Sequence, residues 1–81
     1  MRFSRHSNRG STVEASRWFA PGDHPRVERK GQLWAVATPE GWRKVHPGDW
    51  ILTDSTGNSW PMGDREFRYC YEPVEDRLPN L

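Results

Sequence analysis

The sequence lacks the cysteines and metal ligands that cross-link many small folds, and it lacks a segment that could anchor a chain in a membrane. Its single cysteine, Cys70, cannot form an internal disulfide, and one cysteine with three scattered histidines does not have the ligand spacing of a structural zinc site. The longest apolar run, residues 33–37, is far shorter than the roughly 20 residues that a transmembrane helix needs. The first residues are basic and polar, without the apolar segment of a secretory signal. We therefore expect a cytoplasmic protein with no metal, no cofactor and no membrane association.

The residues that usually fill a core are also scarce, since Val, Ile, Leu and Phe together number 13 of 81. A fraction this low raises the question of disorder. The net charge of +1 and the five Trp, three Phe and two Tyr argue against it, because disordered chains combine high net charge with few aromatics. A chain of 81 residues forms a single core, which excludes a multidomain enzyme. The composition therefore predicts one globular domain with an aromatic core.

Short segments of alternating apolar and polar residues, separated by turn signals, predict an all-β fold. Within residues 12–18, Val13 and Ala15 fall on one face of a strand and polar residues on the other. Residues 32–38 predict a central strand, with a short helix as the alternative. We expect about six short strands in a small antiparallel meander or a partly open SH3-like barrel. The predicted strands are residues 12–18, 27–38 with a hairpin at Lys30–Gly31, 42–45, 50–53, 58–61 and 67–72.

Changes in composition divide the chain into three parts. Residues 1–11 are polar and aperiodic apart from one expected short strand, and they predict a flexible basic N-terminal arm. Residues 12–74 form the single β domain, and residues 75–81 form a charged C-terminal tail. Asp64 is a candidate N-cap for one short helical turn at residues 64–67.

Pro47, Gly48 and Asp49 are interpreted as a structural turn rather than a catalytic loop. Pro at i+1 and Gly at i+2 are the type II arrangement, in which the Asp49 side chain accepts hydrogen bonds from nearby amides. A general acid or base at Asp49, beside His46, would also need a pocket and a reacting partner. The serines lie in no nucleophile elbow, and Cys70 lies in an aromatic segment typical of a packed residue. We therefore expect no catalytic residue and no enzyme activity.

Aromatic residues next to cations are the candidate binding residues. Tryptophan and arginine are typical of protein-binding hot spots, and rings beside cations also bind single-stranded nucleic acid or nucleotides. The core competes for the same rings, and for any one Trp the core is the commoner location. Residues 1–48 carry nine Lys and Arg against four Asp and Glu, whereas residues 49–81 carry three against seven, so a basic surface forms only if the fold separates the two parts. The candidates are Arg17, Trp18, Trp34, Trp42, Arg43 and Trp60.

Motifs that follow one another along the chain resemble a group of small tailed-bacteriophage proteins. They are V-E-A-S-R-W at residues 13–18, G-W at 41–42, P-G-D-W-I-L-T at 47–53, Trp60-Pro61, Phe67 and Y-E-P-V at 71–74. The resemblance covers residues 12–74, with departures from the pattern of the group at residues 8–11 and 62–66. It implies that the chain comes from a phage genome. It carries over no catalytic residue, because the group has no established activity.

The leading hypothesis is a small non-catalytic accessory protein, encoded by a phage, that binds a host or phage protein, for example to inhibit a host system. The alternative is a module that binds single-stranded nucleic acid or a nucleotide through the same aromatic and basic residues. Its affinity would fall as the salt concentration rises. Because a short sheet leaves strand edges unpaired, we also expect a homodimer formed through an edge strand.

Overall fold

The computed structural model describes residues 1–74, and the tail predicted for residues 75–81 lies outside the described residues. The described residues form eight strands and one short helix, which confirms the predicted all-β class. In chain order the elements are β1 (Arg2–Arg5), β2 (Asn8–Arg17), β3 (Val27–Lys30), β4 (Leu33–Thr38), β5 (Gly41–Lys44), β6 (Trp50–Thr53), β7 (Ser59–Met62), α1 (Asp64–Cys70) and β8 (Tyr71–Pro73).

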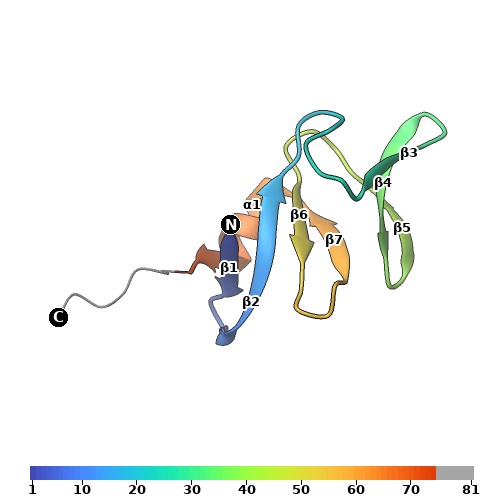
Figure 1. The fold of residues 1–81 in the computed structure, drawn as a ribbon. Helices are drawn as coiled ribbons and strands as arrows, with labels where there is room; N and C mark the ends of the chain where they lie inside the picture. The colour runs from blue at the N-terminus through green and yellow to red at the C-terminus, as the bar shows by residue number, and fades with distance from the viewer. Residues whose placement is uncertain (75–81) are drawn as a thin grey trace.

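The strands form two antiparallel sheets, shown in Figure 1. The large sheet has the order β7-β6-β2-β1-β8, and the small sheet has the order β3-β4-β5. The small sheet is a meander, whereas the large sheet brings together strands from both ends of the described chain. The sequence predicts the short strand within residues 1–11 and a final strand that ends at residue 72, but it gives no signal that these segments, β1 and β8, pair with each other.

The N-terminal segment, residues 1–11, does not form the predicted flexible arm. It contains β1 and the beginning of β2. These two strands pair with each other, and Phe3 lies opposite Val13. On its other side β1 pairs with β8, where Phe3 lies opposite Pro73. The Phe3 ring is buried and packs edge-on against Phe67, with 4.7 Å between the ring centroids. One buried ring therefore anchors a polar segment that has no apolar periodicity of its own.

Helix α1 occupies a segment in which the sequence predicts one helical turn followed by a strand. Its N-cap is Gly63, and Asp64, predicted as the N-cap, is the first helical residue. One contact within the helix and one with the first residue of β8 stabilise it. The Asp64 carboxylate accepts a hydrogen bond from Arg68 Nε at 2.9 Å, and the rings of Phe67 and Tyr71 stack with 5.3 Å between centroids. The strand predicted for residues 67–72 is wrong for residues 67–70, which are helical, and correct for Tyr71 and Glu72, which lie in β8.

Buried apolar side chains form two clusters, and β6 contributes to both. The neighbouring residues Ile51 and Leu52 point to opposite faces of this strand, as successive residues of a strand do. Aromatic rings are the largest members, as the composition predicts. The cluster beside α1 consists of Phe3, Ala15, Leu52, Phe67 and Tyr71. The cluster between the two sheets consists of Trp18, Val27, Val36, Val45 and Ile51.

The predicted structural turn lies between β5 and β6. Gly48 has a φ of 97°, a conformation that glycine adopts without the strain a Cβ would cause. The Asp49 carboxylate accepts a hydrogen bond from the His46 amide at 2.8 Å, and the Asp49 amide donates to the His46 carbonyl at 2.9 Å. Arg17 Nε donates to the Gly48 carbonyl at 2.9 Å. The turn is therefore bonded internally and tied to the end of β2.

Candidate functional site

The small sheet has one face toward the core and one face toward solvent. Residues paired across an antiparallel ladder point to the same face. Val27 and Val36 are such a pair, and both are buried in the cluster between the sheets, so their face is the inner one. Residues that alternate with Val27 and Val36 along the strands point the other way. We call this second face the outer face, and it consists of Glu28, Lys30, Leu33, Ala35, Ala37, Trp42 and Lys44, of which only the small Ala35 is buried.

Trp42 and Leu33 are exposed apolar side chains on the outer face, with 48% and 49% of their surface accessible to solvent. The Lys30 ammonium lies 4.0 Å from the centroid of the Trp42 ring, which is a cation–π geometry. Lys30 Nζ also lies 3.9 Å from the Glu28 carboxylate. An aromatic ring that is already restrained loses less conformational entropy on binding. The outer face therefore presents a restrained tryptophan beside an exposed leucine.

Arg17 and Trp18, two of the candidate binding residues, have structural positions. Trp18 is 2% exposed and belongs to the cluster between the sheets, so its ring cannot contact a partner. Its indole Nε1 has no hydrogen-bond partner within the described part of the chain. The Arg17 side chain binds the Gly48 carbonyl, and its guanidinium stacks over Phe19 with 5.0 Å to the ring centroid. Trp18 therefore packs in the core, and Arg17 stabilises the turn at Gly48.

Of the other three candidates, Trp34 and Arg43 lie on the inner side of the small sheet, whereas Trp60 lies on β7 of the large sheet and packs against the cluster beside α1. Trp34 is half-buried against Trp18, with 6.1 Å between ring centroids, and Arg29 covers its other side. Arg43 and Trp60 line one polar cleft of about 360 Å³ between the sheets. The structure therefore brings Arg43 and Trp60 together and directs Trp42, a neighbour of Arg43 in sequence, to the opposite face.

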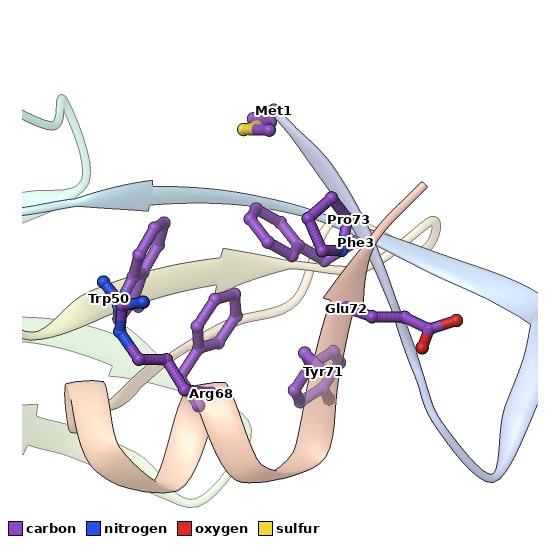
Figure 2. A pocket seen from close by; sticks show the side chains of 8 residues that line it. Met1, Phe3, Trp50, Arg68, Tyr71, Glu72 and Pro73 are labelled. Carbon is purple, nitrogen blue, oxygen red and sulfur yellow. The ribbon is translucent and has the colours of Figure 1, made fainter. Parts of the chain in front are cut away.

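A second cleft, of about 420 Å³, lies between α1 and the large sheet, and the sequence reasoning missed it (Figure 2). Glu72 and Arg68 lie at its edge. Figure 2 shows the Glu72 carboxylate pointing away from the rings, and this carboxylate lies 2.8 Å from His6 Nδ1. The four-residue spacing of Phe67 in α1 and Tyr71 at the start of β8 is the only local signal for this cleft, because its other walls come from distant segments. The apolar side chains that line it are Met1, Phe3, Trp50, Phe67, Tyr71 and Pro73.

Asp64 fixes one wall of this aromatic cleft. Its Oδ1 accepts a hydrogen bond from the Trp50 indole at 2.9 Å, and Arg68 Nε lies within 3.1 Å of both carboxylate oxygens. Arg17 Nη2 lies 3.5 Å from Oδ2. The Trp50 hydrogen bond, with smaller contributions from Arg68 and Arg17, lowers the pKa of Asp64 against the opposing effect of partial burial. Asp64 is therefore an ionised group that positions Trp50 and Arg68 at neutral pH.

The other perturbed titratable groups lie in loops. The hydroxyl and amide of Thr56 donate to the Asp54 carboxylate, and the hydroxyl contributes most to lowering the pKa of Asp54. Burial, followed by the charge of Arg26, lowers the pKa of His24. Within residues 1–74, no group of three His, Cys, Asp or Glu side chains is arranged to hold a metal ion. The same residues include no helix with the length and apolar character needed to cross a membrane.

Comparison with models of protein families, with curated proteins and with solved structures gave no match for this chain. The resemblance to tailed-phage proteins therefore stays a prediction from the motifs at residues 12–74.

Proposed function

We propose that the chain is a small non-catalytic binding module that contacts a partner protein through the outer face of the small sheet. Trp42 carries the proposal, because nearly half of this large ring is exposed while Lys30 holds it from one side. Tryptophan is among the residues that contribute most to binding energy at protein interfaces. Leu33 adds a second exposed apolar side chain on the same face.

The composition of the outer face favours a protein over a nucleic acid as the partner. Its charged residues are Lys30, Lys44 and Glu28, and Glu28 already pairs with Lys30 at 3.9 Å. Nucleic-acid affinity comes largely from several cations that neutralise phosphates. Among the described residues, Lys44 is the one charged group of this face without an ion-pair partner, and a face with few charges amid apolar side chains resembles the centre of a protein interface. Binding of single-stranded nucleic acid is kept as an outcome of the test.

The resemblance to tailed-phage proteins supports a partner encoded by the phage or by its bacterial host. The motifs that carry the resemblance include G-W at residues 41–42, so the exposed Trp42 belongs to that pattern. The proposal needs no catalytic residue, since the energy of such an interface comes from burying Trp42 and Leu33.

The test compares two exposed aromatic residues from different parts of the surface. Trp42→Ala removes the ring of the outer face, and Tyr69→Ala removes the ring of α1, which is 83% exposed. The immobilised chain and both variants are incubated with a bacterial lysate, and affinity is then measured for any protein retained in stoichiometric amount. We expect Trp42→Ala to weaken binding by about 30-fold or more, the loss of a hot-spot residue, and Tyr69→Ala to change it little.

Two results would contradict the proposal. Equal binding by Trp42→Ala and the wild-type chain would show that the outer face is not the contact surface. A salt-sensitive quench of Trp fluorescence by single-stranded oligothymidylate, lost in Trp42→Ala and without a protein partner, would favour the nucleic-acid alternative.

A further inference from the structure

We propose that the free edge of β5 binds an extended acidic peptide segment, which adds to the small sheet as a fourth antiparallel strand. The inference deepens the proposed function, because β5 carries Trp42 and borders the outer face. Strand addition of this kind combines main-chain hydrogen bonds along the edge with side-chain contacts on both faces of the sheet.

The two sheets have four edge strands, and three of them are poorly suited to strand addition. Strands β7 and β8 contain Pro61 and Pro73, which have no amide hydrogen to donate. On β3, the Val27 amide already donates to the His24 carbonyl at 3.2 Å. Strand β5 contains no proline, and all four of its residues are exposed. Figure 1 shows the small sheet at the side of the molecule away from β8.

The hydrogen-bond pattern shows which β5 amides face the free edge. The Val45 amide donates to the Trp34 carbonyl at 2.8 Å, so the backbone of Val45 faces β4. Backbone groups in a strand alternate in direction, so Arg43, two residues earlier, also faces β4. Trp42 and Lys44 therefore point their N–H and C=O groups outward. Within the described chain no hydrogen bond joins the Trp42 or Lys44 amide to another residue outside the β4–β5 ladder.

Charge decides between an acidic peptide and a second copy of this chain. Strand β5 carries Arg43 and Lys44 and no carboxylate. Pairing β5 with β5 of a second copy would line up four cations on one ladder, and like charges across a ladder are destabilising. An acidic strand would neutralise the same two residues. The charge on β5 therefore opposes the edge-to-edge homodimer predicted from the sequence at this edge.

The alternation of side chains specifies the sequence that fits. The residues opposite Lys44 and Trp42 share the outer face, and the residue opposite Arg43 lies on the inner face. A strand antiparallel to β5 meets these residues in the order Lys44, Arg43, Trp42. The fitting sequence is therefore Glu-Glu-Val, with the valine against the Trp42 ring.

The test uses a capped peptide that contains Glu-Glu-Val at its centre, and the same peptide with lysines in place of the glutamates. Lys44→Pro removes an amide that faces the free edge, so the pairing of β5 with β4 is kept. Arg29→Pro is the matched control, because it removes one cation and the outward amide of the opposite edge strand, β3. Far-UV circular dichroism is used to test whether both variants fold, and NMR titration of the backbone amides measures binding.

We expect the acidic peptide to shift the amides of β5 and to bind at least tenfold more tightly than the lysine peptide. Arg29→Pro should bind like the wild-type chain, and Lys44→Pro at least tenfold more weakly. Equal affinity of the two peptides, equal affinity of the two variants, or no shift with either peptide would overturn the inference. A homodimer in light scattering that Lys44→Pro abolishes would also overturn it, in favour of a second copy. If Trp42→Ala abolishes protein capture while Lys44→Pro does not, the proposed function stands and only the edge inference fails.

Discussion

Phe67 holds α1 against the large sheet, and its removal has a predictable energetic effect. The ring is 2% exposed and lies between three other rings. It stacks on Trp50 with 4.2 Å between centroids and on Tyr71 with 5.3 Å, and it meets the edge of Phe3 at 4.7 Å. Truncating a buried Phe to Ala costs about 3–5 kcal/mol from lost burial and the resulting cavity. A domain of 81 residues has a total stability of about 4–12 kcal/mol at about 0.05–0.15 kcal/mol per residue.

Phe67→Ala should therefore remove a large part of the free energy of unfolding. Urea denaturation followed by Trp fluorescence measures it, because Trp50 lies against the deleted ring. Phe19→Ala is the control, since Phe19 is 55% exposed and contacts the Arg17 guanidinium at 5.0 Å, and we expect it to cost less than about 1 kcal/mol. A cost for Phe67→Ala below about 1 kcal/mol, or equal to that of Phe19→Ala, would refute the role given to the aromatic stack.

Three further results are expected. Because the folded-state pKa of Asp64 lies below its unfolded value, the stability it contributes is present above the unfolded pKa and is lost as the pH falls through the folded pKa. Asp64→Asn should therefore lower the thermal unfolding midpoint at pH 7. It should also make the midpoint fall less steeply than that of the wild-type chain between about pH 5 and pH 2. If the midpoint of the variant depends on pH as that of the wild-type chain does, the ionised role of Asp64 is contradicted. Gly48→Ala should cost about 1–2 kcal/mol in chemical denaturation because of its φ of 97°. Gly10→Ala, at a glycine without positive φ, should be neutral or slightly stabilising, and equal effects would contradict the turn.

Local patterns predict most of the small sheet and its turns. Glycine at positions 31 and 48 predicts turns that require a positive φ, and both residues have one, at 64° and 97°. Strands β3, β4 and β6 lie within predicted segments, because each has its own apolar residues beside a turn signal. The structure of such segments is determined by residues within the segment and in the adjacent turn.

Features that depend on distant partners were predicted poorly. Strand β1 has one buried ring, Phe3, whose partners Trp50 and Phe67 lie about half a chain away or more. No pattern within residues 1–11 reports those contacts. The aromatic cleft was missed for the same reason, since its walls come from β1, β6, α1 and β8.

The tryptophans illustrate why candidate binding residues cannot be ranked from sequence. Trp18 and Trp42 each have an adjacent arginine in sequence, yet Trp18 is 2% exposed and Trp42 is 48% exposed. The Trp18 side chain points into the cluster between the sheets, whereas the Trp42 side chain points to the outer face of the small sheet. That direction depends on ladder register, which is a property of the paired strands.

Amide hydrogen exchange along β5, measured by NMR with and without the acidic peptide, shows whether the β5 edge is free and whether it pairs with an added strand. In the free chain we expect the Arg43 amide, which faces β4, to exchange slowly and the Trp42 and Lys44 amides to exchange fast. Bound peptide should slow Trp42 and Lys44 by at least about tenfold and leave Arg43 nearly unchanged. Protection of Trp42 and Lys44 in the free chain, or no change on adding the peptide, would contradict a free β5 edge that recruits a partner strand.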